Sequence, residues 1–203
     1  MSGTIALVDY GAGNLQSVRN ALKAAGAAII NVTARPEDVL SAGRIVLPGV
    51  GAFAHCMGAL SGIDGMVEAL NMATGAGAKP FLGICVGMQL MAEVGEEHGS
   101  HAGLGWAKGR VRLLEPSDPA VKIPHMGWND VVPLESHSLI EPGEAYFLHS
   151  FAYEGEDVLA RTEHGAPVVA AIGRGNRIGV QFHPEKSQQY GLAFLARFLE
   201  WKP

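Results

Sequence analysis

Short apolar runs alternate with helical patterns through the first hundred residues, and this alternation restricts the fold more than any other feature of the sequence. Strands that alternate with helices are typical of βαβ units, so we expect a mostly parallel sheet with helices on its faces. The expected strands are residues 4–10, 27–33, 44–49 and 80–84. The expected helices are residues 14–26, residues 52–73 with a break near Gly62, and residues 86–97.

The second half of the chain has a different pattern, in which short alternating runs are separated by Pro and Gly. These runs are residues 109–115, 129–134, 145–153, 167–173 and 177–182. The last two meet at Gly175 and Asn176, which predicts a hairpin, so we expect antiparallel strands added to the parallel sheet. A helix over 190–201 should pack back on it. Because no repeat or linker divides the chain, residues 1–203 should form a single α/β domain.

Composition excludes several classes of protein. Only Cys56 and Cys85 are present, too few for a disulfide scaffold, and the N-terminus carries no basic and apolar leader, so we expect a cytoplasmic protein. No apolar run approaches the roughly 20 residues that a bilayer requires. With a net charge of -5 and dispersed Lys and Arg, the chain has no basic surface for nucleic acid.

Cys85 stands at the corner between the expected strand 80–84 and the expected helix 86–97. Gly83 and Gly87 flank it in the spacing G-x-C-x-G, which suits a nucleophile held in a strained turn. The amino end of a helix would also favour the reactive thiolate. On this motif alone, a buried structural cysteine fits equally well, and for Cys56 it is the only interpretation that we favour.

A second motif makes catalysis by Cys85 the better interpretation. His183-Pro184-Glu185 follows the last expected strand, and proline restricts its neighbour to extended geometry, so the imidazole and the carboxylate should project to the same side. A histidine can exchange a proton with a cysteine while a carboxylate orients it. We therefore predict a catalytic triad of Cys85, His183 and Glu185.

Acyl transfer also needs donors for the developing oxyanion. The loop "LPGVGAF", residues 47–53, could turn the N–H of Val50 toward the substrate, and the N–H of Val86 follows the nucleophile directly. A plain turn between strand and helix would explain the same loop.

Six stretches carry a resemblance to a known family. The first three are "DYGAGNLQSV" (9–18), "LPGVGAF" (47–53) and "GICVGMQ" (83–89), and the others are "PHMGWN" (124–129), "HSFAY" (149–153) and "QFHPEKS" (181–187). In these stretches the chain resembles the class I glutamine amidotransferases, and within them the glutaminase subunits of imidazole glycerol phosphate synthase. "DYGAGN" and "PHMGWN" distinguish this subunit from the rest of the family.

The resemblance implies a flavodoxin-like fold and the hydrolysis of L-glutamine to glutamate and ammonia, without a cofactor. It assigns the substrate's amino acid end to Gln89 and Glu97, with Glu93 and Glu96 as alternatives to Glu97. It also assigns backbone groups of Gly51, Ser150 and Phe151 to the substrate pocket. The chain has Val86 where leucine is usual and Phe151 where tyrosine is common; since both positions contribute mainly backbone groups, we expect little effect.

The resemblance also implies a partner. Glutaminases of this kind form a heterodimer with a (β/α)8-barrel cyclase that consumes the ammonia and releases imidazole glycerol phosphate and an aminoimidazole carboxamide ribotide. All 203 residues match the glutaminase, so the cyclase is expected to be a separate chain. Asn14, Met126, Trp128 and Asn129 are the expected contacts, although Trp128 could instead belong to the core.

Other interpretations have less support. "GAGN" lacks the third glycine of a dinucleotide loop, and His98 with His101 forms no metal-binding pattern, so we expect neither NAD nor a metal. Two rival functions remain: another glutaminase of the family, such as the subunit for pyridoxal phosphate synthesis, and a non-catalytic flavodoxin-like binding module with an incidental cysteine.

Overall fold

The computed structural model describes residues 3–203, and its first half is the expected parallel sheet with helices on both faces. The strand order is β2-β1-β3-β4, with every contact parallel. These strands are β1 (Ile5–Val8), β2 (Ile30–Thr33), β3 (Arg44–Gly49) and β4 (Phe81–Cys85). Their helices are α1 (Leu15–Ala24), α2 (Pro36–Ser41), α3 (Phe53–Ser61) and α4 (Met66–Thr74). Strands β1, β3 and β4 are buried along their whole length, which explains why their sequences are almost continuously apolar.

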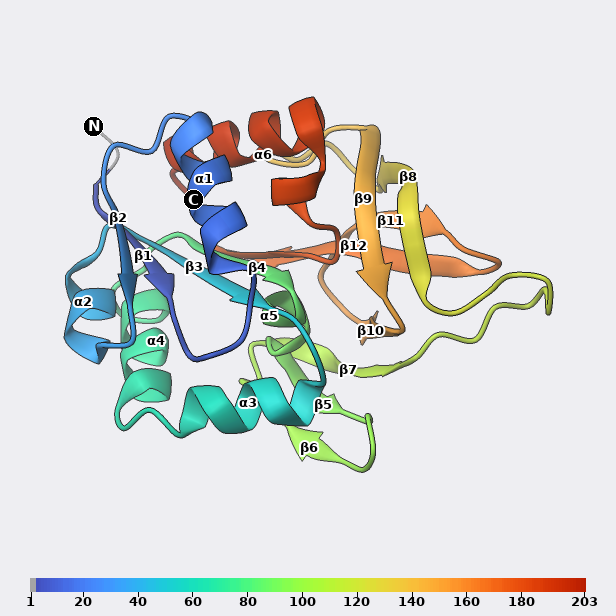
Figure 1. Cartoon of the computed structure of the whole chain (residues 1–203), viewed down its shortest axis with the longest axis horizontal. Coiled ribbons are helices and arrows are strands. Elements are labelled where there is room, and N and C mark those ends of the chain that lie inside the picture. Colours follow the sequence, from blue (N-terminus) through green and yellow to red (C-terminus); the bar gives the residue numbers. More distant parts are fainter. Residues whose placement is uncertain (1–2) are drawn as a thin grey trace.

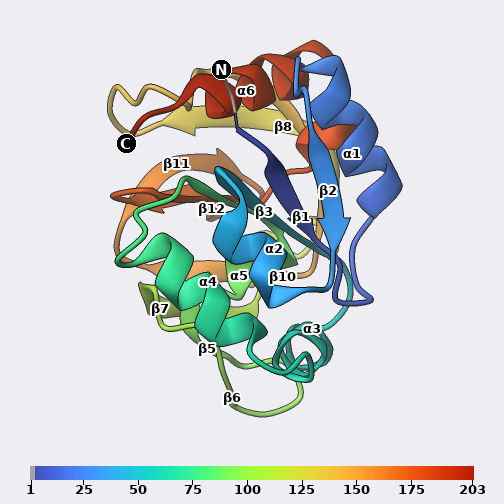
Figure 2. The ribbon, with the colours of Figure 1, turned by 90° about the vertical axis from the view of Figure 1, so that its left-hand side faces the viewer.

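The helices divide between the two faces of the sheet. Helix α1 packs beside the closing helix α6 (Gln188–Glu200) on one face, while α2, α3 and α4 lie on the other (Figures 1 and 2). The apolar side chains of α6 that repeat at helical spacing, including Phe194, Leu195 and Phe198, are buried. The prediction that this helix packs back on the sheet is therefore confirmed.

The second half extends the same sheet. Strand β13 (Arg177–Val180) lies parallel beside β4, and the sheet continues with β12 (Pro167–Arg174), β11 (Val158–Glu163), β8 (His125–Pro133) and β9 (Gly143–His149). Strands β12 and β13 form the predicted hairpin, with Arg174 opposite Arg177. Strand β11 had no counterpart among the predicted runs.

A second, four-stranded sheet was not predicted. Its order is β10-β7-β5-β6, and its strands are β5 (Ala92–Gly95), β6 (His101–Ala102), β7 (Ala107–Leu113) and β10 (Phe151–Gly155). The run 145–153, predicted as one strand, is divided at Ser150 between β9 in the first sheet and β10 in the second. This division puts the Ser150 peptide at the junction of the two sheets.

The predicted helix over 86–97 is wrong beyond its first turn. Helix α5 covers only Val86–Gln89, and β5 begins at Ala92. The carbonyl of Leu90 accepts the N–H of Leu104, and the carbonyl of Met91 accepts the N–H groups of Trp106 and Ala107. Residues 86–92 are buried on all sides, and such an apolar run does not reveal its period.

Over residues 3–203 the longest helix is α6, with 13 residues, and no helix in that range is long and apolar enough to cross a membrane.

Candidate active site

The ends of three parallel strands bring the predicted catalytic residues together. In the register of the sheet, Cys85 at the end of β4 lies beside Gly49 at the end of β3, and Ile84 lies beside Val180 at the end of β13. The chain leaves β13 and reaches His183 three residues later. Ligands of open α/β sheets bind outside these carboxyl ends, so the site has the position that the fold favours.

The backbone at Cys85 is strained, as the predicted corner requires. Cys85 has φ 54° and ψ -112°, in the region that non-glycine residues rarely adopt. A Cβ on Gly87 would lie 1.9 Å from the carbonyl oxygen of Leu47, and one on Gly83 would lie 2.6 Å from that of Gly87. Both flanking positions therefore admit only glycine without a shift of the backbone.

The expected contribution of a long helix to thiolate formation needs correction. Helix α5 has four residues, so few peptide dipoles align behind Cys85. The sulfur has two polar neighbours instead. The Nε2 amide of Gln181 lies 3.6 Å from Sγ of Cys85, and His183 lines the same cavity, close enough for the sulfur to raise the pKa of its ring.

His183 and Glu185 form a buried ion pair. Nδ1 of His183 lies 2.8 Å from Oε1 of Glu185, and the two side chains are 3% and 2% exposed. Burial opposes the charge on His183, but Cys85 and Glu185 outweigh it and raise the pKa of His183 to about 10. The imidazole therefore holds its proton at neutral pH, with the carboxylate of Glu185 against Nδ1.

A cavity of about 250 Å³ opens over Cys85. All the residues predicted for catalysis, the oxyanion and the substrate line it except Glu185, which lies behind His183. These lining residues are Val50, Gly51, Cys85, Val86, Gln89, Glu97, Ser150, Phe151 and His183. Leu148, His149 and Lys186 complete the wall and were not predicted.

Gln89 links the corner to the opposite wall of the cavity. Its Nε2 donates to the carbonyl of Phe151 at 2.8 Å and to Oε1 of Gln181 at 3.0 Å. Gln181 is fully buried and was not predicted as a site residue, although it begins the stretch "QFHPEKS". A glutamine in an otherwise apolar strand end was the signal that could have identified it.

The structure distinguishes the three candidate glutamates. Oε2 of Glu97 accepts the N–H of Phe53 at 2.8 Å, and Glu97 lines the cavity. Glu93 accepts the N–H of Gly109, and Glu96 pairs with Arg110 at 3.5 Å. Of the three, Glu97 alone combines a fixed carboxylate with access to the cavity.

The expected partner contacts lie in two environments. Met126 is 66% exposed and Trp128 is 47% exposed, so the alternative that Trp128 belongs to the core is excluded. Asn14 is exposed and caps α1 by accepting the N–H of Ser17 at 3.4 Å. The Asn129 amide points into the chain, where it meets His125 and the carbonyl of Glu163.

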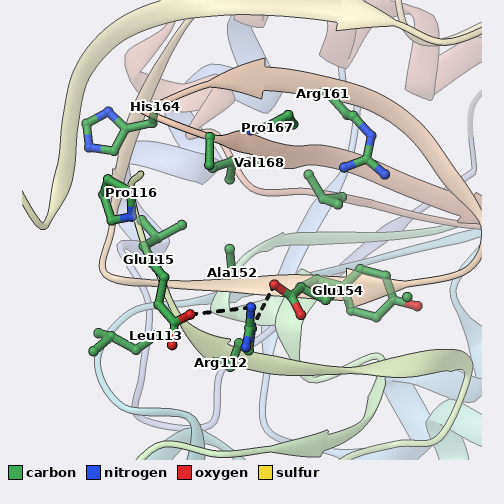
Figure 3. Close-up of a pocket in the computed structure, with 15 residues that line it drawn as sticks. Arg112, Leu113, Glu115, Pro116, Ala152, Glu154, Arg161, His164, Pro167 and Val168 are labelled. Carbon is green, nitrogen blue, oxygen red and sulfur yellow. Dashed lines mark ion pairs between the residues drawn. The ribbon is translucent and has the colours of Figure 1, made fainter. Parts of the chain in front are cut away.

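A second cavity, of about 350 Å³, lies between β7 and β10 on one side and β11 and β12 on the other (Figure 3). Arg112 in its wall lies 2.7 Å from Glu154 and 3.7 Å from Glu115. This cavity contains none of the predicted site residues, and we assign it no chemistry. Across residues 3–203, no group of three or more His, Cys, Asp or Glu side chains could hold a metal ion.

The chain is similar to known proteins over nearly its whole length. The model of a family described as "Glutamine amidotransferase class-I" matches residues 6–201. "Imidazole glycerol phosphate synthase subunit HisH" of Zymomonas mobilis is 62% identical over 208 residues, covering 100% of this chain and 98% of that protein. The protein of the same name from Rhodospirillum rubrum is 54% identical, covering 98% of this chain and 99% of its own length.

Solved structures with lower identity share the fold. A crystal structure of a glutamine amidotransferase superposes with a TM-score of 0.74 at 17% identity, covering 97% of this chain and 99% of that one. The structure of PurLQS from Thermotoga maritima contains a chain with a TM-score of 0.71 at 20% identity, and the coverage is 98% and 97%.

Proposed function

The chain belongs to the class I glutamine amidotransferase family, and we propose that it is the glutaminase subunit of an imidazole glycerol phosphate synthase. It hydrolyses L-glutamine to glutamate and ammonia, and the ammonia serves histidine biosynthesis. The single observation that carries the catalytic part is the buried His183–Glu185 pair facing Cys85 in a cavity of substrate size. The named relatives favour this function over a glutaminase for pyridoxal phosphate synthesis and over a non-catalytic module.

The triad performs acyl transfer. The Cys85 sulfur attacks the side-chain carboxamide carbon of glutamine, and the backbone N–H groups of Val50 and Val86 stabilise the oxyanion. Protonated His183 gives its proton to the departing ammonia, which leaves a thioester on Cys85. His183 then takes a proton from water, the hydroxide attacks the thioester, and glutamate is released with the thiolate restored.

The rest of the cavity holds the substrate's amino acid end. The carboxylate of Glu97 is fixed by Phe53 and is suited to bind the ammonium group of glutamine. Backbone groups of Gly51, Ser150 and Phe151 surround the remainder of the substrate, and Gln89 lies one turn beyond Cys85 on the same wall. The cavity thus presents an acidic group at one end and the nucleophile at the other.

The partner is a cyclase subunit, and we propose a separate (β/α)8 barrel that docks beside the cavity. Ammonia released into water would be protonated and lost, so the receiving site must cover the opening. Met126 and Trp128 are exposed on β8, and Leu148, opposite Met126 in the β8–β9 register, lines the cavity. Such an apolar surface at the mouth of an active site is suited to a partner.

The test compares two nitrogen sources in the two-subunit complex. Cys85→Ala should abolish synthesis that depends on glutamine and leave synthesis from ammonium salts intact, because only the first requires the thioester. Loss of both activities would show that Cys85 is structural, and retention of both would exclude it as the nucleophile. Glutamate release measured with and without the cyclase would test the partner.

A further inference from the structure

Two histidines outside the triad lie opposite each other at the start of β8 and the end of β9, with their rings edge to face. His125 and His149 are opposite one another in the strand register, 3% and 7% exposed. Nδ1 of His125 lies 3.1 Å from Nε2 of His149. The mechanism uses neither ring, yet His149 lines the cavity and precedes the Ser150 and Phe151 peptides that surround the substrate.

The hydrogen-bond partners determine which nitrogen of each ring carries the proton. A carbonyl oxygen only accepts, so Nδ1 of His149 donates to the carbonyl of Phe151, at 2.9 Å. Nε2 of a neutral His149 is then an acceptor, and Nδ1 of His125 must donate to it. This leaves Nε2 of His125 to accept from the amide of Asn129, at 3.0 Å. The bonds run in one direction, from Asn129 through both rings to Phe151.

Both rings must be neutral for this chain of bonds to exist. Burial lowers the pKa of His149 to about 3, with smaller contributions in the same direction from His125, His164 and His183 and an opposing one from the Phe151 carbonyl. Burial, together with His164, lowers the pKa of His125 to about 4. A proton on Nε2 of His149 would face the Nδ1 proton of His125, so a charged pair would repel.

The chain of bonds continues from Phe151 to the nucleophile. The Phe151 carbonyl also accepts from Gln89, which donates to Gln181, and the Gln181 amide contacts Sγ of Cys85. The Ser150 carbonyl is held separately by the N–H of Leu114 at 2.9 Å. Hydrogen bonds to the surrounding fold thus fix both peptide carbonyls in this wall of the cavity.

The Asn129 end of this series of hydrogen bonds lies on β8, the strand that carries the exposed Met126 and Trp128. Side chains alternate along β8, so His125 and Asn129 face inward while Met126 and Trp128 face solvent. We propose that His125 and His149 are positioning residues that hold the Phe151 peptide against the substrate. They also connect this peptide to β8, the strand whose exposed face is proposed to bind the partner. This inference rests on the proposed function, because it assigns Phe151 to glutamine binding and β8 to the partner.

The first test uses variants of His125 in the two-subunit complex. His125→Phe keeps the ring that stacks on Phe147 and His164 but removes the donor, leaving Nε2 of His149 buried without its partner. His149 is then no longer held in one orientation against the Phe151 carbonyl, so the KM for glutamine should rise roughly 5- to 150-fold. His125→Asn retains a donor near Nδ1 and should keep the KM within about threefold. His164→Phe is the matched control, since it keeps the stacking and lies outside the chain of bonds.

The second test observes the tautomers directly. ¹⁵N spectra of the imidazole groups in the wild-type chain at pH 7 should show both rings neutral with the proton on Nδ1. A proton on Nε2 of either ring, or a charged ring, would overturn the inference even if every His125 variant failed to fold.

The outcomes separate this inference from the proposed function. An unchanged KM in a folded His125→Phe complex would overturn the positioning role, while Cys85→Ala would still report on the glutaminase itself. If Cys85→Ala retained glutamine-dependent synthesis, the proposed function would fail whatever the spectra showed. Synthesis from ammonium salts should be unaffected in all His125 variants, and its loss would point to a general structural role.

Discussion

Among residues 3–203, the carboxylate of Glu185 has one hydrogen-bond partner, His183. Removing the charge of this carboxylate gives a quantitative test of the triad. Glu185 bonds to Nδ1 of His183 at 2.8 Å, and its second oxygen is buried without a partner among residues 3–203. Glu185→Gln keeps the size of the side chain and allows an oxygen to accept from His183. The substitution therefore removes the charge while leaving the geometry possible.

The expected loss follows from burial. A hydrogen bond between charged groups contributes about 1.5–3 kcal/mol and a neutral one about 0.5–1.5 kcal/mol, and leaving protonated His183 without its carboxylate adds to the difference. With both side chains at most 3% exposed, solvent does not screen the pair. We expect a cost of about 2–3 kcal/mol, which is roughly a 30- to 150-fold fall in kcat for glutamine hydrolysis.

The assay is glutamate release by the complex at saturating glutamine, repeated across pH. Because the carboxylate stabilises the protonated imidazole, its loss lowers the pKa of His183, and the alkaline fall of kcat/KM should move to lower pH. Glu141→Gln is the matched control, since Glu141 is 63% exposed where it pairs with Arg197 and should have no effect. A kcat for Glu185→Gln within threefold of wild type, with an unshifted pH profile, would refute this account of the triad.

Three further predictions concern stability and the partner. Gly87→Ala should lower the free energy of unfolding by about 3 kcal/mol in urea, because its Cβ would meet the Leu47 backbone; Gly58→Ala, with open space around it, should not, and equal effects would contradict the steric argument. Folding raises the pKa of His183, so the stabilising effect of its protonation is complete below pH 6.5 and should be lost as pH rises toward about 10. A His183→Asn variant whose free energy of unfolding has the same pH dependence as wild type would disprove this. Trp128→Ala should weaken cyclase binding by about 2 kcal/mol, roughly 30-fold in Kd by calorimetry, with unfolding unchanged because the side chain is 47% exposed; unaltered binding would remove Trp128 from the interface.

Much of the fold follows from local patterns. The four parallel strands, the helices between them, the 175–176 hairpin and the closing helix each have a period or a turn signal within a short window. The strained corner at Cys85 was also predictable, because only glycine fits on either side of it. The helix expected over 86–97 was wrong because residues 86–92 are buried on every side. Such an apolar run has no period that distinguishes a helix from a strand.

Only part of the candidate site could be predicted from local sequence patterns. The triad and the substrate residues came from short motifs and a family resemblance. Gln181, His125 and His149 were not identified as site residues, because their roles depend on partners far along the chain.

Local sequence was sufficient to predict parallel strands with helices between them, the glycine-framed thiol and the His-Pro-Glu motif, since each depends on neighbouring residues. The placement of β13 beside β4, which brings His183 to Cys85, and of Ser150 where two sheets meet came from the folded structure alone. The same holds for the direction of the histidine hydrogen bonds. Strand order and register set which distant backbones are adjacent, and both are selected by the packing of the whole core.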